Sequence, residues 1–218
     1  EQKLIQKTAK EFADAELVPG AIERDEKKIW PREAVTKMAE LGFMGIMVDP
    51  KWNGGGMDTI SYTIAMEEIS RGDASCGVIM SVNNSLVCFL LEKYASDTIK
   101  ETYLKPLASG ETRSCFNMTE PSGAGSDPTM LKTIAVPDGN HFVINGRKWF
   151  ITGANGAAFT IIMAYVPDGH GMQSGPTMFL APMDADGICI ERSQETMDTS
   201  FTGGHGQVVL DDLRVPAD

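Results

Sequence analysis

The sequence predicts an α+β protein in which an all-α helical domain, residues 1–112, precedes an antiparallel all-β barrel or sandwich domain, residues 113–218. Composition changes near residue 112: the first part holds 31 charged residues, 9 Gly and 4 Pro, and the second holds 18, 13 and 7. Apolar residues recur at helical spacing in the first part, whereas the second contains short β-branched and aromatic runs. No low-complexity linker separates the two parts.

Five helices are expected in the first part. Ile5, Ala9, Phe12 and Glu16 repeat at helical spacing, and Pro19 ends that helix. A second helix begins at Pro31, buries Val35, Met38 and Leu41, and stops at Gly42. After an open loop at 53–56, the other helices are expected at residues 59–71, at 76–94, and from Asp97 to about Pro106 and Gly110.

The helix at 76–94 covers most of the longest uncharged stretch, Ala74 to Leu91. Its length suits a membrane span, but the adjacent Asn83 and Asn84 would be costly at the centre of a bilayer. We therefore expect a buried helix of a soluble protein, surrounded by other helices.

The second part contains short strand-like runs at residues 113–118, 141–144, 148–152, 160–166, 177–181 and 208–210. Pro137-Asp138-Gly139 and Asn145-Gly146 are typical of the tight turns that join antiparallel strands. Strands at this spacing favour a small barrel or sandwich.

Charge and cysteine content exclude several classes of function. A formal net charge of −11 opposes general attraction to nucleic acid or to an anionic membrane. The four cysteines and three histidines show no metal-ligand spacing, so we expect no metal and reduced, mostly buried thiols. The expected location is the cytoplasm, or the mitochondrial matrix if the source is eukaryotic.

Two motifs in the second part carry chemistry. In the segment from Cys115 to Asp127 a strand is broken by Pro121, and its glycines let the backbone approach a ligand whose anionic groups could accept backbone N–H bonds. In Asn145-Gly-Arg-Lys-Trp-Phe-Ile-Thr152 a strand carries two aromatics and a hydroxyl, which could flank a flat ring. Taken alone, the first segment is equally compatible with a Gly-rich connection between strands, and the second segment favours a core strand.

Together, the two motifs resemble those of the acyl-CoA dehydrogenase family. Thr119-Glu-Pro followed by Ala124-Gly-Ser-Asp127 is similar to the family's TEPxAGSD signature, and Asn145-Gly-x-Lys with Phe150-Ile-Thr152 is similar to NGxKxWIT. Met66-Glu-Glu-Ile-Ser-Arg71, the glycines at 54–56 and Leu213-Arg-Val-Pro216 also match. The residues Met80-Ser-Val-Asn-Asn-Ser85 are especially similar to short-chain members.

The resemblance implies an FAD-dependent oxidoreductase of fatty acid metabolism that acts on an acyl-CoA and passes electrons to an electron-transferring flavoprotein. Family members have a helical N-terminal domain, a middle β-domain that faces the flavin, and a C-terminal helical bundle, and they usually form homotetramers. Carried over by position, the cofactor-binding residues are Phe116, Met118, Thr119, Ser126, Phe150, Ile151 and Thr152. Ser126 is also placed near the CoA thioester. If the strand at 148–152 alternates, Phe150 and Thr152 share one face and Trp149 and Ile151 the other.

Three positions depart from the family pattern. Ser122 and Gly123 stand where one residue is usual, and Phe150 replaces the usual tryptophan. Phe201-Thr-Gly-Gly-His-Gly206 replaces a loop that commonly contains Arg-Gly-Ser. The sequence therefore does not select an acyl-chain length.

No catalytic residue is assigned from the sequence. The family's base is a carboxylate on the C-terminal bundle, which this chain lacks, so we expect a piece of a longer protein that is inactive alone. Glu120 is the nearby alternative, and its place before Pro121 favours a structural role. Two further hypotheses are an acyl-CoA oxidase of the same fold and a noncatalytic flavin- or CoA-binding or assembly module.

Overall fold

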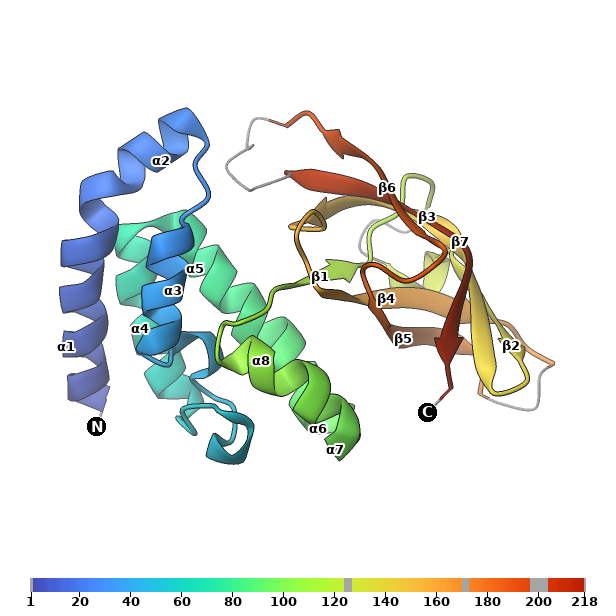
Figure 1. Ribbon diagram of the computed structural model, residues 1–218, viewed down its shortest axis with the longest axis horizontal. Helices are drawn as coiled ribbons and strands as arrows, with labels where there is room; N and C mark the ends of the chain where they lie inside the picture. The colour runs from blue at the N-terminus through green and yellow to red at the C-terminus, as the bar shows by residue number, and fades with distance from the viewer. Residues whose placement is uncertain (1, 124–126, 170–172, 197–203, 218) are drawn as a thin grey trace. The chain divides into compact units, whose positions relative to one another are not determined.

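The computed structural model describes residues 2–123, 127–169, 173–196 and 204–217, and its chain divides into two compact units, residues 1–113 and 114–218 (Figure 1). The α-helices of the first unit are α1 (Gln2–Phe12), α2 (Ala21–Lys27), α3 (Arg32–Glu40), α4 (Thr59–Gly72), α5 (Ala74–Ser81), α6 (Phe89–Tyr94), α7 (Asp97–Ile99) and α8 (Lys105–Ala108). Shorter 3-10 or π-helical segments are η1 (Ala13–Leu17), η2 (Val18–Gly20), η3 (Phe43–Gly45), η4 (Pro50–Trp52), η5 (Val82–Cys88), η6 (Lys100–Leu104) and, in the second unit, η7 (Pro128–Met130).

The first helix continues past its predicted end. Instead of stopping at Pro19, the chain passes through a π-helical turn, η1, and a short 3-10 turn, η2, into α2, which was not predicted. The π-helical turn moves the next buried position from Glu16, where ordinary helical spacing places it, to Leu17. Glu16 instead lies at the surface, where it accepts a 2.6 Å hydrogen bond from Lys37.

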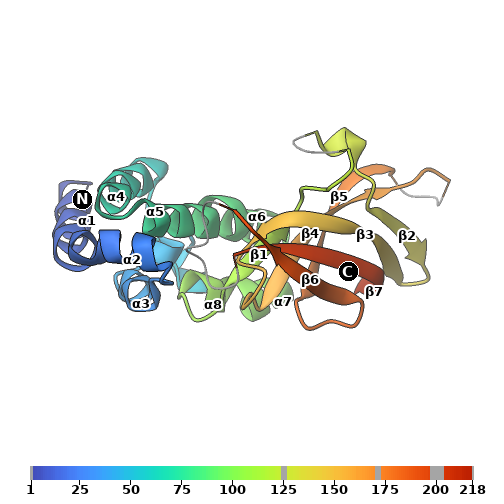
Figure 2. The same cartoon turned by 90° about the horizontal axis from the view of Figure 1, so that it is seen from above.

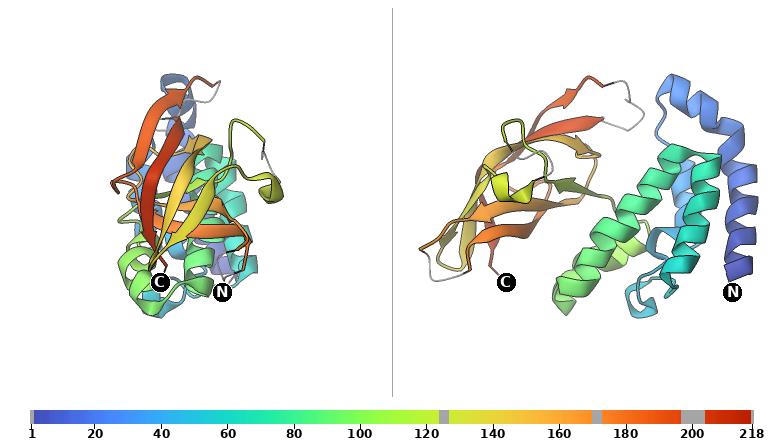
Figure 3. Two further views of the ribbon diagram at one scale, coloured as in Figure 1. Left: turned by 90° about the vertical axis from the view of Figure 1, so that its right-hand side faces the viewer. Right: turned by 180° about the vertical axis from the view of Figure 1, so that it is seen from behind.

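Other helix boundaries agree with their sequence signals. Pro31 precedes α3, and Gly42 follows it with a φ of 77°, the left-handed conformation that commonly ends helices. Val35 and Met38 are buried as predicted, but Leu41 at the C-terminal end of α3 is exposed. In Figure 3 the helices of this unit lie side by side. Ion pairs join neighbouring segments, such as Lys37 with Glu16 and Arg71 with Asp14.

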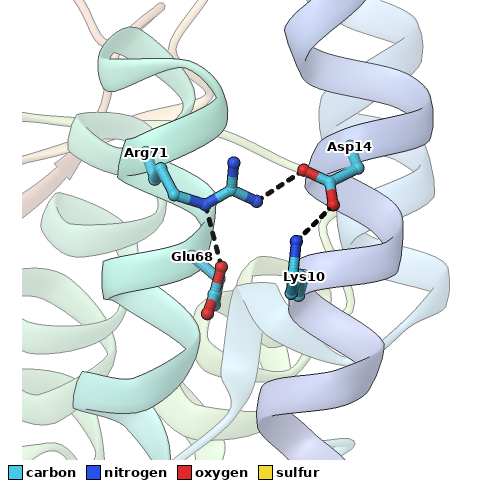
Figure 4. Close-up of polar contacts among 4 residues, drawn as sticks. All are labelled: Lys10, Asp14, Glu68 and Arg71. Carbon is cyan, nitrogen blue, oxygen red and sulfur yellow. Dashed lines mark hydrogen bonds and ion pairs between the residues drawn. The ribbon is translucent and has the colours of Figure 1, made fainter.

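A surface network links the start of the chain to α4. Arg71 contacts Asp14 at 2.6 Å and Glu68 at 3.0 Å, and Lys10 contacts Asp14 at 2.6 Å (Figure 4). The hydrogen bonds from Lys10 and Arg71 lower the pKa of Asp14. Ion pairs at the surface fix orientation more than they stabilise.

A half-buried ion pair fixes the start of α5. Asp73 caps that helix by accepting from the backbone N–H groups of Ser75 and Cys76, and its other oxygen pairs with Arg24 at 2.7 Å. Arg24 also donates to the carbonyl of Leu17. This contact ties α2, the turn before it and α5 together.

The predicted helix at 76–94 is a continuous helical segment formed by α5, η5 and α6. It is the one helix among the described residues that is long and apolar enough to cross a membrane. Asn83 and Asn84 are nevertheless buried, and both donate to carbonyl groups of the preceding chain, at Met44 and Phe43 respectively. The helix therefore serves as a core helix of its unit. The expectation that it is surrounded was too strong, because Val78, Val82 and Phe89 are exposed along one face.

The second unit is a curled mixed sheet of seven strands, β1 (Ser114–Asn117), β2 (Ile134–Asp138), β3 (His141–Thr152), β4 (Phe159–Val166), β5 (Gly175–Pro182), β6 (Ile188–Gln194) and β7 (His205–Pro216). In Figure 2, β3, β7 and β6 run beside one another. Its core gathers inward side chains from nearly every strand, with Phe142 and Phe179 in an edge-to-face contact at 4.9 Å.

Two features of the sheet differ from the expectation. The sheet is mixed, because β4 pairs in parallel with β1 and β2, while its pairing with β5 is antiparallel. Asn145-Gly146 is no hairpin turn, since β3 runs continuously through it. The Pro137-Asp138-Gly139 turn between β2 and β3 is confirmed, with Gly139 at a φ of 63°. Strands β2 and β6 were not predicted.

Candidate functional site

The structure brings the two sequence motifs together in the second unit. The backbone N–H of Trp149 in β3 donates to the carbonyl of Thr119, which follows β1, at 3.0 Å. The adjacent Lys148 ammonium donates to the carbonyl of Met118 at 3.0 Å. The segment after β1 and the end of β3 therefore form one continuous surface.

The buried side chain of Lys148 supports this surface from the core side of the sheet. Its position faces the core, in phase with Phe142 and Ile144 of the same strand, and its side chain has no exposed area. Nζ donates to Glu120 Oε1 at 2.9 Å, to the Met118 carbonyl, and to the Met163 carbonyl of β4 at 2.6 Å. All three ammonium protons thus have partners, as a buried charge requires.

Glu120 completes the network and has the predicted structural role. Its carboxylate, 2% exposed, also accepts from the backbone N–H groups of Lys132 at 2.6 Å and Thr133 at 2.9 Å. Burial raises the pKa of Glu120, but hydrogen bonds from Thr133, Lys148 and Lys132 outweigh it, so the pKa lies below its ordinary value. Burial lowers the pKa of Lys148, and Glu120 opposes that shift. A buried carboxylate that accepts three hydrogen bonds, one of them from an ammonium, holds the loop in place.

The outer side of the joined motifs carries apolar side chains. On β1, Cys115 and Asn117 point into the core, so Phe116 and, beyond the strand, Met118 lie on the other side. Met118 is 39% exposed, Phe116 is partly buried, and Thr119 is partly buried beside them.

A β-bulge turns Phe150 and Thr152 outward. Counting from the inward Lys148, regular alternation would place both side chains in the core. The register between β3 and β7 shifts between Lys148 and Ile151, and Phe150 adopts a φ of 55°. Phe150 is consequently 47% exposed, Thr152 is exposed and Ile151 is buried. The side chain of Ile151 lies in the core, so contact with a ligand on the outer face falls to its backbone.

Side chains of β3 itself and of neighbouring strands support the bulge. Gln194 at the end of β6 accepts from the Phe150 N–H at 3.1 Å, and the Trp149 ring lies 4.9 Å from the Phe150 ring. His205 at the start of β7 contacts the Thr152 hydroxyl, with 2.7 Å between Nδ1 and Oγ1. Sequence reasoning missed both Gln194 and His205. The sequence did contain a signal for His205, because this residue lies in the segment 201–206 that departs from the family pattern.

Ser126, predicted for both cofactor and substrate, lies outside the described residues, as do its neighbours Ala124 and Gly125. The flanking Asp127 caps η7, accepting from the backbone and hydroxyl of Thr129. That bond lowers the pKa of Asp127.

The outer face suits a flat aromatic ligand with a polar edge. Phe116, Met118 and Phe150 offer apolar contact, and the hydroxyl of Thr152 stands beside them. This donor set fits an isoalloxazine ring and offers little to a metal ion. Among the described residues no cluster of His, Cys, Asp or Glu could hold one.

Three of the four cysteines, Cys76, Cys88 and Cys115, are buried, and Cys189 on β6 is exposed. Burial raises the pKa of Cys76 to about 12 and that of Cys115 to about 11, and it also raises the pKa of Cys88. These three thiols are therefore un-ionised at neutral pH.

Comparisons with known proteins match the whole chain. The family model described as acyl-CoA dehydrogenase, N-terminal domain, matches residues 1–111, and that described as the middle domain matches residues 115–213. The mitochondrial short-chain specific acyl-CoA dehydrogenase of Rattus norvegicus is 36% identical over 214 residues, which are 98% of this chain and 51% of the relative.

Solved structures agree. Butyryl-CoA dehydrogenase from Megasphaera elsdenii has a TM-score of 0.86 and 30% identity, covering 99% of this chain and 57% of its own. A glutaryl-CoA dehydrogenase from Mycobacterium smegmatis in complex with FADH2 has a TM-score of 0.87 and 30% identity, covering 99% and 54%. The chain thus spans about half the length of the relatives it matches.

Proposed function

Because this chain belongs to the acyl-CoA dehydrogenase family, as its motifs predicted, we propose that it forms the helical and flavin-facing portions of an FAD-dependent acyl-CoA dehydrogenase. The observation that carries the proposal is the joined surface of the two motifs, with exposed Met118 and Phe150 beside the Thr152 hydroxyl. When bound, FAD supplies the acceptor for the hydride that leaves the substrate's β-carbon.

The residues of this chain bind and orient the flavin ring, and they do not transfer protons. Phe116, Met118 and Phe150 supply contact area for the ring, and Thr152 supplies a hydroxyl at its edge. Lys148 and Glu120 hold the two segments at fixed spacing, so the face is formed before any ligand arrives. The base that removes the α-proton is proposed to lie outside this chain.

The further assignments rest on the family. We propose an acyl-CoA as substrate, with Ser126 near its thioester, and an electron-transferring flavoprotein as electron acceptor. The complete protein is proposed to be a homotetramer located in the cytoplasm or, in a eukaryote, in the mitochondrial matrix.

The proposed reaction predicts a spectral result. The purified protein that carries this chain should contain FAD, and anaerobic addition of its acyl-CoA should bleach the flavin absorption within one turnover. A panel of short, medium and branched acyl-CoAs identifies the chain length. Absence of flavin from properly folded protein would contradict the proposal. Bound flavin that no acyl-CoA bleaches would indicate the noncatalytic module, and rapid oxygen consumption would indicate an oxidase.

Substitutions at the bulge should separate flavin contact from folding. Thr152→Val keeps the shape but removes the hydroxyl, so we expect a loss of roughly 1–3 kcal/mol in cofactor retention or in the barrier to reduction. Phe150→Ala should loosen the flavin because it removes an exposed ring. Trp149→Ala is the comparison: because the Trp149 ring lies 4.9 Å from the Phe150 ring, it should lower the melting temperature and perturb the bound flavin less than Phe150→Ala does. The reverse pattern, with Trp149→Ala perturbing the flavin and Phe150→Ala not, would place Trp149 against the ring.

A further inference from the structure

His205 and Thr152 form a polar pair at the edge of the candidate flavin face. They are direct partners across β3 and β7, and their Nδ1 and Oγ1 atoms lie 2.7 Å apart. On its other side His205 is paired with Gln194 of β6, whose carbonyl oxygen accepts from the Phe150 N–H. The outward hydroxyl and the outward ring of β3 are therefore both held by side chains of neighbouring strands.

The hydrogen-bond chemistry of this pair has two states. A threonine hydroxyl has one proton and accepts through its lone pairs, whereas imidazole Nδ1 either donates or accepts, depending on the tautomer. When Nδ1 carries a proton, it donates to Oγ1 and leaves the hydroxyl proton free for a ligand. When Nδ1 is bare, the hydroxyl donates to it and presents only lone pairs to the ligand.

Resting on the proposed function, we propose that His205 is a positioning residue that lets Thr152 bond to the flavin edge in both oxidation states. A flavin ring nitrogen that takes up hydride changes from a hydrogen-bond acceptor to an N–H donor. Thr152 can match the acceptor while His205 donates, and it can match the donor while His205 accepts. A change of tautomer moves the ring proton of His205 between Nδ1 and Nε2, so the pair keeps its charge.

The family pattern does not supply this pair. His205 belongs to the segment 201–206 that departs from the family's usual loop. A carbonyl partner could only accept from the Thr152 hydroxyl, whereas imidazole can either donate to it or accept from it.

The test compares His205 variants in the FAD-loaded protein. His205→Leu removes the polar partner, and His205→Asn restores a group that can donate or accept at nearly the same place. His141→Leu is the matched control, because His141 lies at the other end of the β3–β7 pairing and contacts Asn140. The readouts are the visible spectrum, the midpoint potential of the bound flavin and the melting temperature.

We expect His205→Leu to change the ratio of reduced-flavin to oxidised-flavin affinity about tenfold, as for one net hydrogen bond. That change corresponds to a shift of about 30 mV for a two-electron couple. His205→Asn should return the potential most of the way to the wild-type value, and His141→Leu should leave it unchanged.

Histidine nitrogen NMR supplies a readout independent of turnover. In the wild-type protein the Nδ1 resonance of His205 should move between its protonated and bare positions when the flavin is reduced, and Thr152→Val should abolish that movement. An unchanged potential in His205→Leu, or an immobile Nδ1 resonance, overturns the proposal while leaving flavin binding intact. A wild-type protein without FAD would instead overturn the proposed function itself.

Discussion

Replacement of Lys148 by methionine is expected to reduce the free energy of unfolding of the β unit by about 3–5 kcal/mol, the usual result of breaking a buried ion pair from one side. Methionine fills a similar volume but leaves the Glu120 carboxylate buried without its countercharge. It also leaves the carbonyl groups of Met118 and Met163 without their donor. The measurement is urea unfolding followed by the fluorescence of Trp149, the tryptophan of this unit.

The double variant Lys148→Met/Glu120→Gln separates charge from packing. Glutamine keeps one oxygen, which can accept from the backbone N–H of Thr133 or of Lys132 but not from both as the two carboxylate oxygens do. It removes the uncompensated charge, however, so the double variant should be more stable than the sum of the single changes predicts. Lys132→Met is the matched control, since Lys132 is exposed, and it should change stability by less than about 0.5 kcal/mol. Strictly additive effects would show that Lys148 and Glu120 are not coupled.

The same substitution bears on cofactor binding. Lys148 fixes Met118 on one segment and is the neighbour of the bulge on the other. We therefore expect Lys148→Met protein that still folds to lose flavin on gel filtration more readily than Lys132→Met protein.

Local signals in the sequence correctly predicted helix ends and turns where a single proline or glycine determines the backbone conformation. Pro31 and Gly42 bound α3, and Gly139 forms the turn before β3, because proline and glycine act through their own φ angles. The same kind of signal failed at Asn145-Gly146. There a Cβ on Gly146 would lie 2.3 Å from the Thr133 hydroxyl, so glycine is required by a close approach of two segments and not by a turn.

The asparagine of that pair is also explained by a distant contact. Asn145 exchanges two hydrogen bonds with Asp212 of β7, from its amide to the carboxylate and from the Asp212 N–H to its carbonyl oxygen. Asp212 has a φ of 49°, so the irregularity that the sequence assigned to β3 is shared with the opposite strand. Only the pairing of β3 with β7 reveals this.

As with the fold, local motifs predicted part of the candidate site, and contacts between distant strands determine the rest. The motifs identified Phe150 and Thr152 as outward residues, but regular alternation from the buried Lys148 would have pointed both inward. The bulge, Gln194 and His205 depend on contacts between residues 44 and 53 positions apart. Such contacts follow from strand register, which no local pattern in this sequence specifies.

Asn84→Leu is expected to destabilise the helical unit by roughly 2–6 kcal/mol, because it leaves two buried backbone groups without partners at about 1–3 kcal/mol each. Asn84 is 1% exposed; its carbonyl oxygen accepts from the Ile46 N–H at 2.9 Å, and its amide donates to the Phe43 carbonyl at 2.8 Å. No leucine atom can replace either bond. Urea unfolding followed by helical circular dichroism measures the loss.

The comparison with Ser85→Leu makes the result specific. Ser85 is the next residue of the same helix, is exposed, and bonds only to the helix's own carbonyl at Ser81, so this change should alter stability by less than about 0.5 kcal/mol. Both substitutions make the helix more apolar. In a membrane-spanning helix both would be favourable, since each removes a polar group from hydrocarbon. A large loss for Asn84→Leu beside a small effect for Ser85→Leu therefore requires a core helix fixed by the amide of Asn84, and equal effects at the two positions would contradict that role.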